Sequence, residues 1–189
     1  MLSDKSSFGD NKFSDVLAGW VQLIVGLFIL SFGIALMVKA NVGMFPWGVF
    51  QLGISVWFKI PFGFSIQVVG LLVIIIAYLV GKVKPRSGTI ANMILIGFFI
   101  DYIIFPVIPF YTIFWHQMVM MILSIVSSAI GTALYMSADL GAGPRDSLMM
   151  ALYIKTKASL RAVRTSLEIF VLIVGYSMGG KVGFGTIIY

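Results

Sequence analysis

The chain has 189 residues, of which 60% are hydrophobic and 11% are charged. Water-soluble domains are about 45–50% apolar and about 25% charged, so this composition indicates a polytopic membrane protein. The net charge is +6, and in a membrane protein an excess of Lys and Arg marks cytoplasmic loops rather than a nucleic-acid surface. The absence of cysteine excludes disulfides and thiolate metal sites, and a single histidine argues against a histidine-based site. We therefore expect no cofactor.

In chain order, a polar tail at residues 1–15 precedes the first apolar run. A membrane span needs about 20 apolar residues. Five runs satisfy this requirement and are predicted to be spans: 16–38, 62–81, 89–105, 114–137 and 161–179. Two shorter runs, 46–58 and 144–156, are too short to cross comfortably. Each begins with proline, which is favoured in the first turn of a helix, so we interpret both as half-helices.

The two half-helices belong to an internal duplication with an offset of 98 residues. Residues 33–46 share six identities in fourteen positions with residues 131–144, without a gap. Chance similarity of apolar spans would explain shared Leu, Ile and Val, but a shared A-x-x-G-x-x-P pattern favours a true duplication. We therefore divide the chain into repeat 1, residues 16–108, and repeat 2, residues 109–189.

The distribution of positive charge predicts that the second repeat is inverted. If the half-helices do not cross, each complete repeat has three spans, and a cytoplasmic N-terminus places ten of the thirteen Lys and Arg on the cytoplasmic side. If they cross, the basic clusters at 82–86 and 155–164 lie on opposite sides. The expected fold is an all-α polytopic helical membrane protein with two inverted repeats, each containing a short half-helix. A sixth span is expected after residues 185–187, where two residues remain.

Several stretches resemble a known family. They are GIALMVKANVGMFPWGVF at 33–50, LGAGPRDSLMMAL at 140–152, SLRAVRTSLE at 159–168 and GGKVGFGT at 179–186. They resemble the YczE/YyaS/YitT family of bacterial integral membrane proteins, and its YczE-like branch most of all. The resemblance implies a multi-pass protein of the bacterial plasma membrane but no secure activity, although transport is often supposed. Family members usually continue through one more span, so this chain departs from the pattern there.

The helix breaks are the candidate functional positions. Backbone groups left unpaired in hydrocarbon cost several kcal/mol each, so a broken helix needs a protein interior or a watery cavity around it. Paired broken helices at matching places in inverted repeats point to a transporter site. The candidate substrate-binding residues are Asn41, Gly43, Asp139, Gly141, Arg145, Asp146, Arg164 and Glu168.

Repeat 2 carries four charges that repeat 1 lacks. Arg145, Asp146, Arg164 and Glu168 correspond to Trp47, Gly48, Ile66 and Gly70. Glu168 lies inside a predicted span, where an acid needs a partner, and the two candidates are Arg164 and Arg145. The four charges are interpreted either as a structural ion-pair knot or as a substrate or proton site.

Other charged residues have simpler interpretations. Asp101 is expected at the outer interface, and Asp139 is expected to cap the turn that follows it. Lys39 and Lys59 are expected to extend toward the membrane surface.

The leading hypothesis is a transporter or permease of a small solute, with its site between the two half-helices. The alternative is a non-transporting membrane scaffold or accessory protein. An enzyme is not expected, because the sequence lacks nucleophile and metal motifs. A polar cleft bordered by Asn41, Gly43, Asp139 and Arg145 would favour transport, and a packed interior would favour the scaffold. The lipid bilayer is the expected partner; a small-molecule substrate and a second copy of the chain stay open, and nucleic acid is not expected.

Overall fold

The computed structural model describes residues 7–110 and 112–188, and its elements are all helical. In chain order they are α1 Ser7–Ala40, α2 Pro46–Phe58, α3 Phe62–Gly81, α4 Ser87–Phe98, η1 Phe99–Ile104, α5 Phe114–Ser137, α6 Pro144–Thr156, α7 Leu160–Ser177 and α8 Phe184–Ile188. The element η1 is a π-helix that continues α4. The all-α prediction is therefore confirmed for the described residues.

In the described part of the chain, four helical segments are long and apolar enough to span a membrane. They are Ser14–Ala40, Phe62–Gly81, Ser87–Ile104 and Phe114–Ser137. The fifth predicted span forms α7, whose 18 residues include three charged ones, and it is not among these four. The half-helices α2 and α6 have 13 residues each and match the predicted bounds. The expected polar tail differs: α1 already begins at Ser7, and residues 1–6 lie outside the described part.

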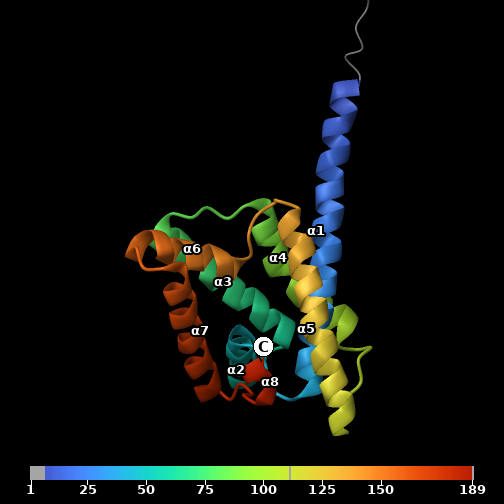
Figure 1. Cartoon of the computed structure of the whole chain (residues 1–189), viewed down its shortest axis with the longest axis vertical. Helices are drawn as coiled ribbons and strands as arrows, with labels where there is room; N and C mark the ends of the chain where they lie inside the picture. Colours follow the sequence, from blue (N-terminus) through green and yellow to red (C-terminus); the bar gives the residue numbers. More distant parts are fainter. Residues whose placement is uncertain (1–6, 111, 189) are drawn as a thin grey trace, which may run out of the picture.

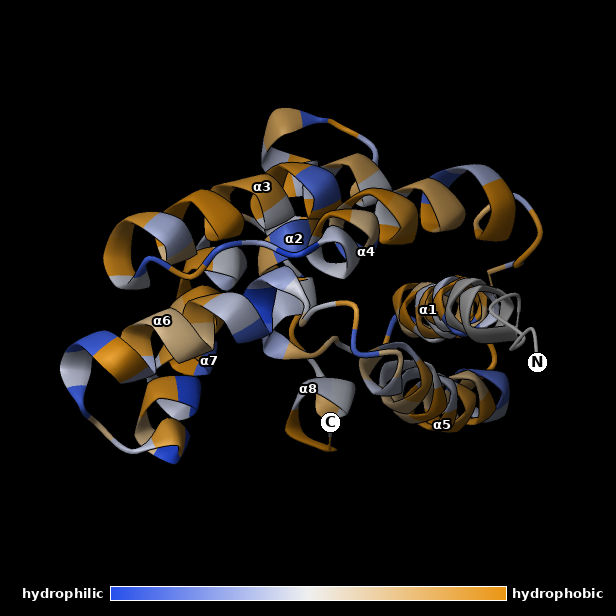
Figure 2. Ribbon diagram, turned by 90° about the horizontal axis from the view of Figure 1, so that it is seen from above, coloured by the Kyte–Doolittle hydropathy of each residue, from blue (hydrophilic) through white to orange (hydrophobic). Residues whose placement is uncertain are grey.

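The three most extensive helix–helix interfaces join the first half of the chain to the second: α1 with α5, α3 with α6, and α2 with α7. Figures 1 and 2 show α1 and α5 side by side, and in Figure 1 α2, α3, α6, α7 and α8 lie on one side of this pair. Gly19 packs near Ala138, and Gly33 packs against Ser124, so α1 and α5 run antiparallel. A side chain at Gly26 would clash with the backbone of α5. Small residues thus allow the two backbones to approach closely.

The described residues with left-handed backbone fall into four pairs. Each pair is separated by 97 or 98 residues, close to the offset of the predicted duplication: Asn41 with Asp139, Gly43 with Gly141, Lys59 with Lys157, and Lys82 with Gly179. Because only a small fraction of residues adopts positive φ, the same rare conformation at matching places shows that the two halves bend in the same way. The helix interfaces also exchange under this pairing, since α3 corresponds to α7 and α2 to α6.

The surface of the molecule is strongly apolar. On α7, Phe170, Ile173 and Tyr176 are each more than 60% exposed. In Figure 2 hydrophilic colour gathers on α6 and α7 and on the loop between α3 and α4, whereas α3 and α5 are mostly hydrophobic. Such a surface fits a helical protein that is surrounded by lipid, because monomeric soluble proteins rarely expose large contiguous apolar patches.

Candidate functional site

The two helix breaks, residues 41–45 and 139–143, each form a hydrogen bond with a segment of the other half of the chain. The Gly88 amide donates to the Leu140 carbonyl at 2.9 Å, and the Gly185 amide donates to the Val42 carbonyl at 2.8 Å. These two hydrogen bonds are reciprocal, because each joins the start of a helix in one half of the chain to the break in the other half. The Leu140 and Val42 carbonyls lie in the breaks and accept these hydrogen bonds from within the protein. A membrane environment requires such internal partners, because hydrocarbon offers none.

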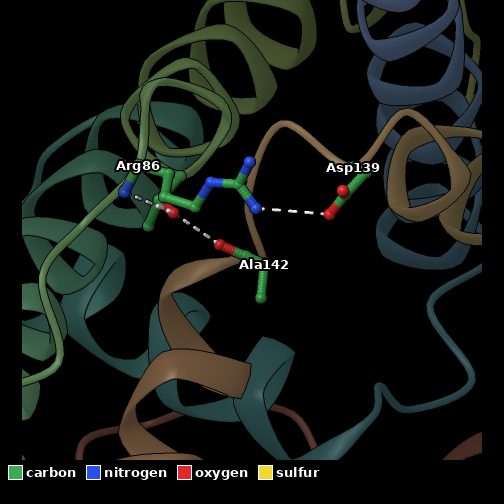
Figure 3. Close-up of polar contacts among 4 residues, drawn as sticks. Arg86, Asp139 and Ala142 are labelled. Carbon is green, nitrogen blue, oxygen red and sulfur yellow. Dashed lines mark hydrogen bonds and ion pairs between the residues drawn. The ribbon is translucent and has the colours of Figure 1, made fainter.

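The break at residues 139–143 is held by the α3–α4 loop (Figure 3). The Arg86 guanidinium pairs with the Asp139 carboxylate at 3.2 Å. The Thr89 hydroxyl donates to the Ala142 carbonyl at 2.7 Å and accepts from the Arg86 amide. The Asp139 side chain is 93% exposed, so it faces away from any cleft. Asp139 thus binds Arg86, which lies opposite it across the loop, and the prediction that it caps the following turn is wrong.

The break at residues 41–45 contacts the loop between α7 and α8. Lys181 Nζ donates to the side-chain oxygen of Asn41 at 2.7 Å. Gly43, with φ of 104°, packs directly against the Gly183 amide. A cleft of about 700 Å³ opens here. Its lining includes Asn41, Gly43, Phe114, Met118, Tyr176 and Lys181.

A second cleft, of about 410 Å³, lies beside the first turn of α6 and is lined by the four charged residues Arg145, Asp146, Arg164 and Glu168. We call it the charged cleft. It is lined by Trp47, Thr132, Tyr135, Met136, Arg145, Asp146, Met149, Arg164, Leu167 and Glu168. The two clefts lie toward opposite ends of α5: Met118 lines the first, and Thr132 lines the charged cleft. At a rise of about 1.5 Å per residue, these two positions are roughly 20 Å apart along the helix.

The pairing inside the charged cleft differs in part from the prediction. Glu168 accepts a hydrogen bond from Arg164 Nε at 3.0 Å, which is one of the two predicted pairings. The Arg145 guanidinium lies 5.6 Å from the Phe45 ring centre, and among the described residues it pairs with no carboxylate. Tyr135 donates to Asp146 at 3.3 Å. The knot of four charges is therefore not formed: Glu168 binds the arginine one turn earlier on its own helix, and Arg145 contacts an aromatic ring.

A small, partly open space of about 40 Å³ lies between the starts of α2 and α6. Phe45, Pro144 and Arg145 border it together with apolar residues of α1 and α3 and two polar residues, Gln51 and Asn92. The four residues expected to border one cleft are therefore distributed: Asn41 and Gly43 line the first cleft, Arg145 lines the charged cleft, and Asp139 lines neither. Gly141 packs against Arg86 and Thr89.

Asp101 has a role that sequence reasoning missed. Its carboxylate accepts the Gly63 amide at 2.7 Å and the Phe64 amide at 2.9 Å, so it caps the start of α3. Because 37 and 38 residues separate the partners, no local pattern indicated this cap. Lys39 also differs from the expectation. It is 8% exposed, and its Nζ lies 4.0 Å from the Phe110 ring centre.

Residues 17–189 match a protein family described as a family of unknown function, DUF6198. The uncharacterized membrane protein YczE of Bacillus subtilis is 34% identical over 92% of this chain and 81% of its own length. The chain belongs to this YczE-like family. An uncharacterized protein of Haemophilus influenzae is also 34% identical, over 88% of this chain and 76% of its own length. The uncharacterized protein YyaS of Bacillus subtilis is 23% identical over 87% of this chain. No solved structure matches.

Proposed function

We propose that this YczE-like protein is an inverted-repeat transporter of a small solute in the bacterial plasma membrane, with its N-terminus in the cytoplasm. The supporting observation is the pair of clefts toward opposite ends of α5. The reciprocal hydrogen bonds of the two breaks support the same proposal. In this arrangement the first cleft opens outward and the charged cleft opens toward the cytoplasm.

The region between the clefts supports transport by alternating access. Only a small space of about 40 Å³ lies between the starts of the half-helices. A solute in the charged cleft would therefore reach the other side only after the two repeats moved relative to one another. The loop contacts Arg86–Asp139 and Lys181–Asn41 lie on opposite sides of the membrane in the proposed topology, where they would open and close in turn.

Single-cysteine labelling tests the proposed topology and the access of the clefts. The natural chain has no cysteine, so each introduced thiol is the only target. Met118→Cys reports the first cleft, and Met149→Cys reports the charged cleft. In intact cells, a membrane-impermeant maleimide should label Met118→Cys at once and Met149→Cys only after permeabilisation. Lys59→Cys and Lys84→Cys are the matched loop controls, expected outside and inside.

Labelling of both loop controls from the same side would reject the inverted topology. If the two loop controls are labelled from opposite sides but neither cleft thiol reacts, the clefts are closed to water. That result would favour the scaffold. Uptake completes the test. Purified protein in liposomes is incubated with a mixed bacterial metabolite extract, and the lumen is analysed by mass spectrometry. We expect enrichment of at least one solute over protein-free liposomes, and its absence would overturn transport.

A further inference from the structure

The walls of the charged cleft are balanced in charge. Arg145 and Arg164 are the two cations, and Asp146 and Glu168 are the two anions. The rest of the lining is largely apolar or aromatic and includes Trp47, Tyr135, Met149 and Leu167. Its volume of about 410 Å³ lies within the usual range of about 300–1,000 Å³ for small-molecule sites. A ligand with no net charge and an apolar part would match such walls.

Two of the four charges already neutralise one another. Arg164 and Glu168 form an ion pair at 3.0 Å on one face of α7. Arg145 and Asp146 have no oppositely charged partner in the described part of the chain. The partner of Asp146 is the neutral Tyr135 hydroxyl, and that of Arg145 is the Phe45 ring. The cleft thus presents one cation and one anion, from consecutive residues of α6, that lack ionic partners.

The chemistry of these two groups indicates the charges that a ligand should carry. A guanidinium binds a carboxylate through two parallel hydrogen bonds, and a carboxylate accepts from an ammonium group. A purely anionic ligand would leave Asp146 without a cation, and a purely cationic ligand would leave Arg145 without an anion. A ligand with both groups pairs both residues, whereas a ligand with one of them leaves the other residue to water alone, so the zwitterion is favoured.

We propose that the charged cleft binds a small zwitterion, an amino acid with an apolar side chain, with its carboxylate on Arg145 and its ammonium group on Asp146. Its side chain packs against Met149 and Leu167, which line the same cleft. This proposal deepens the proposed transport function and rests on it for the role of the cleft, but binding can be measured without transport.

Thermal stability of the purified protein in detergent tests the ligand class with matched probes. L-Leucine carries both charges, 4-methylpentanoate lacks only the ammonium group, and 3-methylbutylamine lacks only the carboxylate. L-Phenylalanine, 3-phenylpropanoate and 2-phenylethylamine form a second set with a larger side chain. At millimolar concentration we expect at least one amino acid to raise the Tm by about 5 °C, and its two analogues to raise it by less than about 1 °C. Equal effects within both sets, or none, would overturn the proposal.

Variants then test the site. Arg145→Gln and Asp146→Asn should each abolish the Tm rise, whereas Arg161→Gln should retain it. Arg161 is an exposed arginine at the start of α7 and does not line the cleft. If Arg145→Gln folds poorly, a second measurement replaces it: protection of the Met149→Cys thiol from labelling when the ligand is bound. This variant keeps both Arg145 and Asp146 intact. The stabilising amino acid should slow maleimide labelling of this thiol at least about fivefold, and unchanged labelling would contradict the site.

The outcomes separate this proposal from the transport proposal. Stabilisation by an amino acid without uptake into liposomes would retain the zwitterion site and reject transport. Uptake of other solutes, with no amino acid that stabilises the protein, would retain transport and reject the zwitterion site.

Discussion

The half-helices α2 and α6 have the same backbone geometry, but the side chains of their first turns differ in charge. Each has 13 residues, begins with proline and ends at a left-handed lysine, Lys59 or Lys157. In α2 the first turn carries no acid, and Trp47 is buried. In α6 the first turn carries Arg145 and Asp146, which line a cleft. The break before α2 has the same backbone conformation as the break before α6, although the first turn of α2 carries no charged residue. The charges of α6 are therefore free for another role.

The largest effect is expected at the glycines of the two breaks. Gly43 has φ of 104° and Gly141 has φ of 133°. A Cβ at Gly43 would lie 2.5 Å from the Gly183 amide nitrogen, and one at Gly141 would lie 2.7 Å from the Arg86 side chain. Backbone strain and overpacking each cost about 1–3 kcal/mol, so Gly43→Ala should lower the unfolding free energy by about 3 kcal/mol. Gly141→Ala should lower it by a similar amount, about 3 kcal/mol, because the atom that its Cβ meets is the Arg86 Cβ, which is fixed to the backbone.

Unfolding in mixed micelles, followed by circular dichroism, measures both losses. Gly19→Ala serves as the control, because its Cβ would make only ordinary contacts at 3.7 Å and alanine favours a helix. If all three variants were equally stable, the two breaks would not be the rigid, matching elements described above.

The next comparison concerns the caps of α3 and α7, which correspond to one another in the predicted duplication. The Asp101 carboxylate accepts two amides at the start of α3, whereas the Ser159 hydroxyl accepts one at the start of α7. Asp101→Asn weakens two charge-assisted hydrogen bonds and should cost about 2 kcal/mol. Ser159→Ala should cost about 1 kcal/mol. The same unfolding assay measures both, and the reverse order would show that the α3 cap contributes little.

Thr89 and Thr186 give a third pair. Thr89 is 2% exposed and donates to the Ala142 carbonyl, while Thr186 accepts from the Gly183 amide at 3.2 Å. Thr89→Val removes that donor and leaves a carbonyl without it, so the unfolding free energy should fall by about 1–2 kcal/mol. Thr186→Val should cost less, about 0.5 kcal/mol, because this residue is partly exposed. Proteolysis rates of the α5–α6 loop provide a local readout, and equal rates in the two variants would contradict this assignment.

The smallest effect is expected for the loop contacts. The Arg86–Asp139 pair is exposed, so a double-mutant cycle with Arg86→Gln and Asp139→Asn should give a coupling of about 0.5 kcal/mol. Asn41→Asp would convert the Asn41–Lys181 hydrogen bond into a similar ion pair and should add about the same amount. Both couplings should shrink in high salt, because exposed charges are screened. A salt-independent coupling would mean that the pair is less exposed than described.

Hydropathy and proline positions predicted the backbone well, because they report local requirements. The expected bounds of the 62–81 and 114–137 spans and of both half-helices agree with α3, α5, α2 and α6. Prediction of side-chain partners was weaker. Arg164 and Glu168 are one turn apart on one helix, so this pair could be inferred, whereas Arg86 and Asp139 meet only after two loops converge. The positive charges at 82–86 predict only the side of the membrane on which this loop lies. They do not indicate that Arg86 pairs with Asp139.

The arrangement of the main helix interfaces has a consequence for biosynthesis. Gly26 on α1 lies against Gly131 on α5, which leaves the ribosome more than 100 residues later. At about 5–20 residues per second, α1 waits roughly 5–20 s for its partner. The same delay applies to α2, whose main partner is α7. During this interval the face of α1 that carries Gly26 and Gly33 is open to lipid or to insertion factors. The stage at which only the first half has been made is therefore the one at which an insertase would be needed most.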